Sequence, residues 1–211
     1  MQITNNLKND ISDAPDWFNQ AVNVKPSEKT LESEKGSLSY SIWSADSQNK
    51  DLLIFIHGTG AHKKWWYPIA PQFLDYSNVI AIDLPGMGDS GFREKYSIKD
   101  FGQCVISIIE KEKIKLGIKN ISIVGHSLGG QVAGYVASEE KELVSNLIMI
   151  DTFIRPPDWD PSQNEGGPLR MIKYYPDKAT ILKRFRLLPQ QECFNKWFVR
   201  YIAEHSVKET E

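Results

Sequence analysis

The pattern of hydrophobic residues changes near Asp51. From there on, short apolar runs alternate with longer segments in which apolar residues recur at helical spacing. The runs are residues 51–58, 78–86, 120–127 and 145–152. Because these runs are apolar throughout, they are typical of parallel strands buried on both faces. The segments between them predict helices at about 65–74, 98–116 and 128–139. Alternating strands and helices predict an α/β fold with a doubly wound, mostly parallel sheet.

The segments on either side of this alternating region have a different character. Residues 13–23 predict a short amphipathic helix, and "KTLESE" and "SLSYSIWSA", which flank Lys35 and Gly36, predict an antiparallel hairpin. After Asp151 the chain is rich in proline, glycine and aromatic residues, and helices are predicted at about 177–186 and 190–204. We therefore expect a core over residues 1–151 and a helical cap over 152–211.

Composition narrows the class of protein. The chain has 211 residues with a formal net charge of −2, and its charges are interspersed, which does not indicate a nucleic-acid partner. It has neither an apolar leader-like start nor a stretch long enough to cross a bilayer, so the expectation is a cytoplasmic protein with no membrane partner. Cys104 and Cys193 lack metal-type spacing, and we expect no metal and no role for them.

The motif most informative about chemistry is Gly125-His126-Ser127-Leu128-Gly129. It fits the G-x-S-x-G pattern, with the apolar run "ISIV" before it and a helix-forming run after it. Such a turn holds the serine in a strained conformation with its hydroxyl clear of the backbone, while the glycines let neighbouring chain come close. The pattern predicts Ser127 as a nucleophile; the alternative is a glycine-rich structural turn.

A second motif, "HGTGAHKKWW", begins at His57 after an apolar strand. Acyl transfer needs backbone N–H groups already placed to bind the developing oxyanion. We assign the N–H of Thr59 as one donor, with Gly60 as a substitute, and the N–H of Leu128 as the other. The alternative is that His57 and Gly58 only form a tight turn.

A third motif, "DLPGMGDSG" at residues 83–91, completes an ordered set with the other two. Together they strongly resemble the α/β-hydrolase superfamily of the serine-nucleophile type with a helical lid. The resemblance covers about residues 28–151, and 152–211 is similar to the lid that follows the sixth strand. It implies the strand order 1-2-4-3-5-6-7-8 and hydrolysis of a carboxylic ester, or related acyl or C–C chemistry, through an acyl-serine. It also implies that no cofactor is needed.

The superfamily places its acid and its histidine after the serine, so the four histidines are weighed in turn. His57 matches the structural histidine of the family, and His126 adjoins the serine, so both are interpreted as structural. His62 could line the site. His205 follows Ser127 in the chain and is the candidate base, although an ordinary polar role on a lid helix is favoured for it.

Two aspartates follow predicted strands. Asp151 ends the sixth strand, where some members of the superfamily carry the acid, so it is a candidate; the alternative, which we favour, is a carboxylate that caps the following turn. Asp83 opens the third motif and is interpreted as structural.

Strands seven and eight of the superfamily are absent from the sequence, so we expect an incomplete α/β-hydrolase whose sixth strand exposes an apolar edge. The expected partner is a small ester or acyl substrate. A non-catalytic ligand-binding protein or decayed hydrolase remains the alternative. A homo-oligomer, or a separate chain that supplies the missing strands, also stays open.

Overall fold

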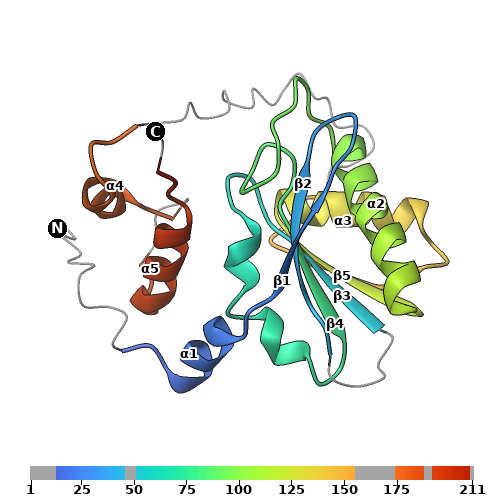
Figure 1. Cartoon of the computed structure of the whole chain (residues 1–211), viewed down its shortest axis with the longest axis horizontal. Helices are drawn as coiled ribbons and strands as arrows, with labels where there is room; N and C mark the ends of the chain where they lie inside the picture. The colour runs from blue at the N-terminus through green and yellow to red at the C-terminus, as the bar shows by residue number, and fades with distance from the viewer. Residues whose placement is uncertain (1–12, 46–50, 155–173, 188–191, 210–211) are drawn as a thin grey trace. The chain divides into compact units, whose positions relative to one another are not determined.

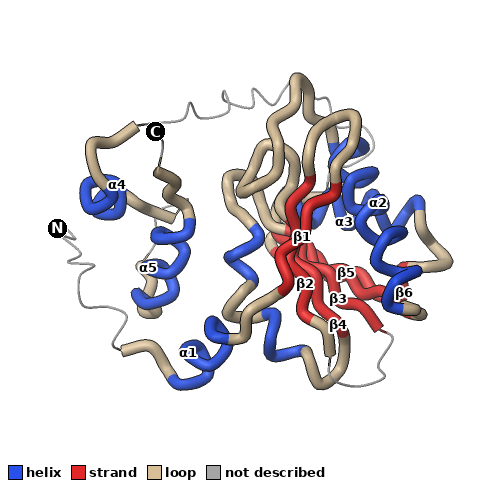
Figure 2. The backbone as a smooth tube through the Cα atoms, viewed as in Figure 1, coloured by secondary structure: helices blue, strands red, loops and turns tan. Residues whose placement is uncertain are grey.

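A computed structural model describes residues 13–45, 51–154, 174–187 and 192–209. Within these ranges the strands form a six-stranded sheet in the order β1-β2-β4-β3-β5-β6 (Figures 1 and 2). β1 pairs antiparallel with β2, and β2 antiparallel with β4, whereas the β4–β3, β3–β5 and β5–β6 pairs are parallel. The predicted hairpin, the doubly wound α/β fold and the order of the first six strands are confirmed.

The observed strands and most of the helices lie where they are predicted, but the helix predicted at about 190–204 begins only at Lys196. The strands are β1 (Ser27–Leu31), β2 (Leu38–Trp43), β3 (Asp51–Ile56), β4 (Asn78–Ile82), β5 (Asn120–His126) and β6 (Val144–Ile150). The helices are α1 (Asp16–Asn23), α2 (Ile98–Leu116), α3 (Leu128–Glu139), α4 (Lys178–Arg184) and α5 (Lys196–His205). The Ser97 hydroxyl starts α2 by accepting the N–H of Asp100 at 3.0 Å.

The prediction of a single helix at about 65–74 is wrong. Two short 3-10 helices occupy this stretch, η2 (Lys63–Trp66) and η3 (Ala70–Phe73). Pro68 and Pro71 explain the difference, because proline has no N–H to donate and its ring clashes with the preceding helical turn. The apolar periodicity was real, but it belongs to two separate turns that cover the sheet.

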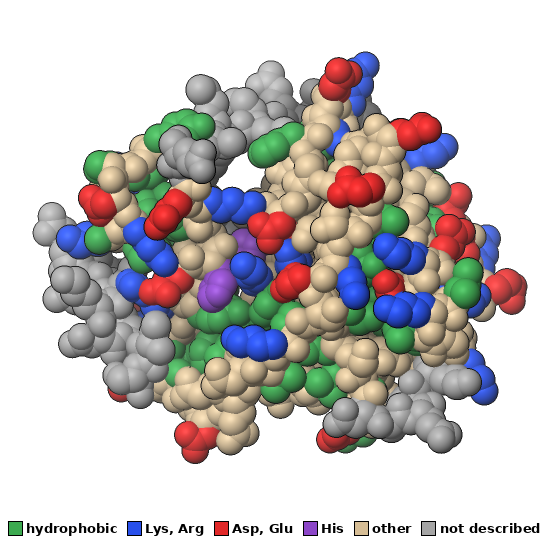
Figure 3. All heavy atoms as spheres, in the orientation of Figure 1, with side chains coloured by type: hydrophobic (Ala, Val, Ile, Leu, Met, Phe, Trp, Pro, Cys, Tyr) green, Lys and Arg blue, Asp and Glu red, His purple; other side chains and the backbone are tan. Residues whose placement is uncertain are grey.

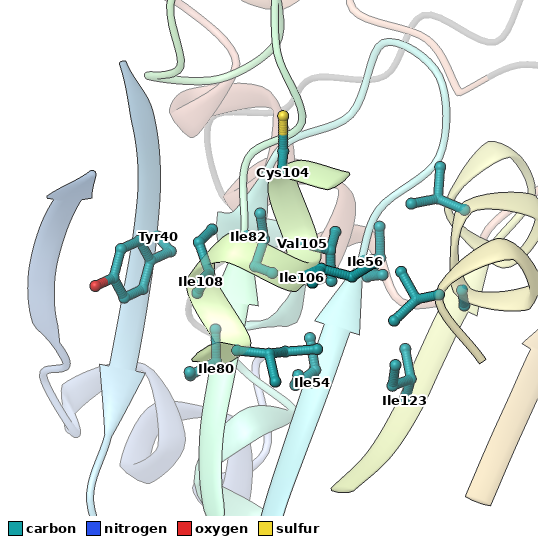
Figure 4. Packing of buried hydrophobic residues seen from close by; sticks show 14 of the residues in the cluster. Tyr40, Ile54, Ile56, Ile80, Ile82, Cys104, Val105, Ile106, Ile108 and Ile123 are labelled. Carbon is teal, nitrogen blue, oxygen red and sulfur yellow. The ribbon is translucent and has the colours of Figure 1, made fainter. Parts of the chain in front are cut away.

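The sheet is buried on both faces by different elements. Isoleucines of β3, β4 and β5 point from one face toward α2 and pack against Val105 and Ile108 (Figure 4). α3 adds Val132 and Val136 to the same cluster. On the other face, Phe55 and its neighbours pack against η2 and η3, and the ring of Trp66 stacks on Phe55 with centroids 4.7 Å apart.

The chain divides into two compact units. Residues 15–153 form the core unit, which contains the whole sheet, and residues 1–14 with 154–211 form the cap unit. In the cap unit, Asp177 caps α4 by accepting the N–H of Thr180 at 2.7 Å. Along α5, Arg200 and Glu204 form an ion pair at 2.6 Å. The cap predicted over residues 152–211 includes residues 155–173, which lie outside the described ranges.

The charges of the core unit are mixed. Figure 3 shows positive and negative side chains interspersed over the visible face of this unit, in keeping with the formal net charge of −2. Among the helices described, none has the length and the apolar character needed to span a membrane.

Candidate active site

Three loops meet at the carboxyl ends of adjacent parallel strands. His57 follows β3, Asp83 follows β4, and Ser127 follows β5. In α/β sheets this edge is where ligands bind, because loops from neighbouring strands converge there. The three motifs found in the sequence therefore lie beside one another, although they are up to 70 residues apart (57 to 127).

Ser127 occupies a sharp turn between β5 and α3. Its backbone has φ 52° and ψ −117°, which is strained for a residue with a Cβ. The Ser127 N–H donates to the carbonyl of Ile150 at 2.9 Å, and the Thr152 hydroxyl donates to the Ser127 carbonyl at 3.3 Å. Residues at the end of β6 thus form hydrogen bonds with both the N–H and the carbonyl of Ser127.

The turn after β3 packs directly on the serine turn. A methyl group placed on Gly58 would lie 3.2 Å from the Cβ of Ser127 and 2.9 Å from the Nδ1 of His126. Only glycine allows the two loops to come this close. The structure therefore brings the loop that carries Thr59 into contact with Ser127.

The two assigned oxyanion donors differ in the contacts that they make. Leu128 is the first residue of α3, so its N–H has no acceptor within the helix. In the turn after β3, Thr59 and Gly60 are both exposed, but the Gly60 N–H donates to the sulfur of Met87 at 3.4 Å. Because Gly60 already has an acceptor, this geometry favours Thr59 as the donor.

His57 is fully enclosed and neutral. Its Nδ1–H donates to the carbonyl of Gly58 at 2.8 Å, while its Nε2 accepts the N–H of Leu84 at 3.1 Å. Burial lowers the pKa of His57 below its ordinary value, outweighing the attraction of Asp83. The Asp83 carboxylate lies 3.9 Å from Nε2, but the two do not form an ion pair, because Nε2 is accepting a hydrogen bond. These contacts explain why His57 holds the loop.

Asp151 follows β6 with its side chain exposed and φ at 46°. Among the described residues 152–154, no hydrogen bond joins its carboxylate to the chain that follows, and residues 155–173 lie outside the described ranges. Both interpretations of Asp151, the acid and the turn cap, therefore stay predictions. Thr152, the next residue, makes the contacts with the serine turn instead.

The two remaining candidate histidines belong to different units. His205 ends α5 in the cap unit, and its Nδ1–H donates to the carbonyl of Tyr201 at 2.8 Å. His62 belongs to the core unit, where it is buried with its ring centroid 6.4 Å from that of Trp65. Among the described residues of the core unit, no hydrogen bond links the Ser127 hydroxyl to a histidine.

Sequence reasoning missed a buried ionic cluster beside the loops. Lys63 is 1% exposed, and its ammonium donates to the carboxylates of Asp83 at 2.9 Å and Asp89 at 2.8 Å and to the Ser39 hydroxyl at 2.9 Å. Burial alone would lower the pKa of Lys63, but the attraction of Asp83 and the hydrogen bonds to both aspartates raise it above its ordinary value. A lysine five residues before Pro68 carries no recognisable signal, because its partners Ser39, Asp83 and Asp89 come from two distant segments of the chain.

The sheet, its strand order and the strained serine turn at the carboxyl end of β5 define an α/β fold of the hydrolase type. A family model described as "alpha/beta hydrolase fold" matches residues 51–186, and the chain belongs to this family.

Three similar proteins indicate the range of the family. The chain is 30% identical over 128 residues to the pimeloyl-[acyl-carrier protein] methyl ester esterase of Pseudoalteromonas atlantica, covering 57% of this chain and 46% of the relative. It is 26% identical to the 2-succinyl-6-hydroxy-2,4-cyclohexadiene-1-carboxylate synthase of Enterobacter sp. strain 638, over 75% of this chain and 56% of the relative. The thioesterase domain from the curacin biosynthetic pathway has a similar fold, with a TM-score of 0.67 at 22% identity, covering 88% of this chain and 69% of that one. The chain thus spans about half the length of these two curated relatives.

Proposed function

We propose that this chain provides the nucleophile and the oxyanion site of a serine hydrolase that cleaves a carboxylic ester or a related acyl bond. The observation that carries the proposal is Ser127 at positive φ in the turn between β5 and α3, packed against Gly58. A strained backbone at this position has a purpose in acyl transfer, because it presents the hydroxyl at the edge where loops converge. The esterase among the relatives supports the substrate class.

The reaction follows from the positions of these groups. The Ser127 oxygen attacks the acyl carbonyl, and the N–H groups of Thr59 and Leu128 donate to the oxyanion that forms. A base takes the hydroxyl proton and passes it to the leaving alcohol, which leaves an acyl-serine. Water then attacks this ester, releases the acid and restores the serine hydroxyl.

We also propose an acid and a base for this reaction. Asp151 is our candidate acid, because it directly precedes Thr152 at the end of β6, next to the serine turn. His205 is our candidate base: its Nδ1–H already donates to a carbonyl, which leaves Nε2 to accept a proton. If no base acts, only the residual catalysis of the oxyanion site and of binding is expected, about 10³–10⁴-fold over water.

A fluorophosphonate probe tests the nucleophile. The Ser127 oxygen should displace fluoride from phosphorus, giving a covalent adduct whose mass and site can be determined by peptide mass spectrometry. Ser127→Ala should abolish the adduct, and Ser138→Ala, which removes an exposed hydroxyl from the same helix, should leave it unchanged. An unlabelled wild-type chain, or an adduct on another residue, would contradict the proposal.

A non-catalytic ligand-binding protein is the second candidate. It is favoured by one observation: within the described residues of the core unit, none of His57, His62 and His126 forms a hydrogen bond with the Ser127 hydroxyl. In that case the oxyanion site should bind a carboxylate or ester without turnover. Isothermal titration with a short-chain carboxylate, alongside the probe experiment, separates the two candidates.

A further inference from the structure

The turn between His57 and Lys63 is held at both of its ends by the end of β4. At the first end, the Leu84 N–H donates to Nε2 of His57. At the second end, the backbone N–H of Lys63 donates to the Asp83 carboxylate at 2.6 Å, and its ammonium donates to the same carboxylate at 2.9 Å. Neighbouring residues of one strand end thus fix both ends of the loop that carries Thr59.

The tip of this turn has few contacts of its own. In the described structure, the hydrogen bonds of residues 58–61 are two bonds accepted by the Gly58 carbonyl, from the Nδ1–H of His57 at 2.8 Å and from the Ala61 N–H at 3.2 Å, and the weak contact from the Gly60 N–H to Met87. Thr59 and Gly60 are exposed. We therefore expect the position of the tip to depend on the two anchors.

The anchor at Lys63 is the charged one, and its ammonium donates hydrogen bonds to three side chains. Asp83 is fully buried, and its carboxylate also accepts the N–H of Asp89 at 2.9 Å. Asp83 is tied to β2 as well, since its N–H donates to the Ser39 carbonyl at 2.9 Å. A buried ammonium is costly unless all its hydrogen bonds are made, so this arrangement tolerates little displacement.

We propose that Lys63 is a positioning residue for the oxyanion site: its ion pairs with Asp83 and Asp89 hold the Thr59 N–H toward Ser127. Lys63 itself does not touch the substrate. The chemical meaning of this role rests on the proposed function, whereas the effect on the loop does not. Misplacement by about 1 Å can reduce a rate about a hundredfold, so a loop anchor has a measurable effect on chemistry.

The test compares Lys63→Met with Lys64→Met. Both remove one positive charge from adjacent positions, but Lys64 is only half-buried, and the structure shows no ion pair for it among the described residues. Two quantities are measured on the full chain: the rate of labelling by the fluorophosphonate probe, and hydrogen–deuterium exchange in peptides that cover residues 57–62.

We expect Lys63→Met to slow labelling about tenfold to a hundredfold, while the labelled fraction still reaches the wild-type level. Exchange should rise much more in residues 57–62 than in α2, where any rise reports only the lower stability of the whole core. Lys64→Met should match the wild type in both measurements. A merely structural role would instead lower the labelled fraction and raise exchange equally throughout the core unit.

Each remaining outcome decides a different question. Wild-type labelling in Lys63→Met, or unchanged exchange in the turn, overturns the positioning role. If exchange rises only in the turn and the probe never labels the chain, the positioning role is supported and the proposed function is contradicted. If Lys63→Met raises exchange equally throughout the core, the variant Asp89→Asn decides, because it removes one of the two partly exposed carboxylates near the ammonium and leaves the buried Asp83 in place. A rise in exchange limited to residues 57–62 supports the role, and a uniform or absent rise overturns it.

Discussion

Buried polar groups hold the carboxyl ends of β3 and β4, whereas β6 at the border of the sheet exposes apolar side chains. Lys63 and Asp83 are 1% and 0% exposed and satisfied by hydrogen bonds. Along β6, Leu147, Ile148 and Ile150 are 39%, 49% and 43% exposed. The groups we propose for nucleophile and oxyanion binding therefore lie next to these packed strand ends, with Ser127 and Leu128 partly buried and Thr59 exposed. The candidate acid, Asp151, lies on the open side.

The two borders of the sheet sharpen this contrast. β1, at the other border, carries Glu28, Lys29 and Thr30, which are polar residues of the kind that discourage pairing with another chain. β6 is the border strand on the other side of the described sheet, where it pairs parallel with β5, and it is mostly apolar. Because apolar strand edges favour pairing with further chain, we expect such pairing at β6 rather than at β1.

The largest effect on the free energy of unfolding is expected when the positive charge of Lys63 is removed from the packed end of the sheet. Lys63→Met leaves Asp83 buried without its counter-ion, which should lower the free energy of unfolding by about 3–5 kcal/mol. Lys64→Met should change it by less than about 0.5 kcal/mol. Urea unfolding of both variants measures the difference. Equal stabilities would show that the buried cluster contributes nothing.

A smaller effect on the free energy of unfolding is expected when a methyl group is added at the same packed end of the sheet. A methyl group on Gly129 would lie 2.3 Å from the carbonyl oxygen of Ile56, so Gly129→Ala should lower the free energy of unfolding by about 3 kcal/mol. The control lies in the same helix. Gly134 has room, because its nearest neighbour would be Met149 at 3.8 Å, and Gly134→Ala should stabilise by up to about 1 kcal/mol. Shifts of the same sign in both urea midpoints would contradict the comparison.

The pH dependence of stability comes next in size. The pKa of His57 is lowered in the folded chain by burial, so below about pH 6.5 the unfolded chain takes up a proton that folded His57 does not. Stability should therefore be full above that pH and fall as the pH decreases, by at most about 1.4 kcal/mol per unit from this group. His57→Gln should flatten the slope between about pH 7.5 and about pH 5.5. An unchanged slope would assign the effect to other groups.

The smallest effect on stability is expected at β6. Ile148→Lys should change the free energy of unfolding by less than about 0.5 kcal/mol, since the side chain is half exposed. It should nevertheless reduce the fluorescence of a bound hydrophobic dye and any self-association. Thr30→Lys on β1 is the matched control and should leave dye binding unchanged. Strong dye binding retained in Ile148→Lys would place the apolar surface elsewhere.

Most of the fold could be predicted from the sequence because periodicity encodes it. The runs at β3, β4, β5 and β6 and the helical spacing of α2 each follow from burial. The segment at 65–74 failed because its apolar spacing resembles that of a helix, whereas Pro68 and Pro71 prevent one. The prediction followed the spacing of the apolar residues, whereas the two prolines determine the structure of this segment.

The candidate site could be predicted only in part. Ser127, Thr59 and Leu128 follow from motifs whose spacing reflects backbone geometry, and the structure places the two loops in contact at Gly58. The Lys63 cluster was missed, because its partners Ser39, Asp83 and Asp89 are brought together only by the folded sheet. The engagement of Gly60 by Met87 likewise depends on tertiary contact.

The hydrogen bonds from the end of β6 to Ser127 have a consequence for biosynthesis. The positive φ of Ser127 costs about 1–2 kcal/mol, and the acceptor and donor that hold its peptide groups are Ile150 and Thr152, more than twenty residues later in the chain (127 to 150). We therefore expect the strained turn at Ser127 to lack both contacts until residue 152 has been synthesised, so that the local conformation of the serine is fixed by chain made after it.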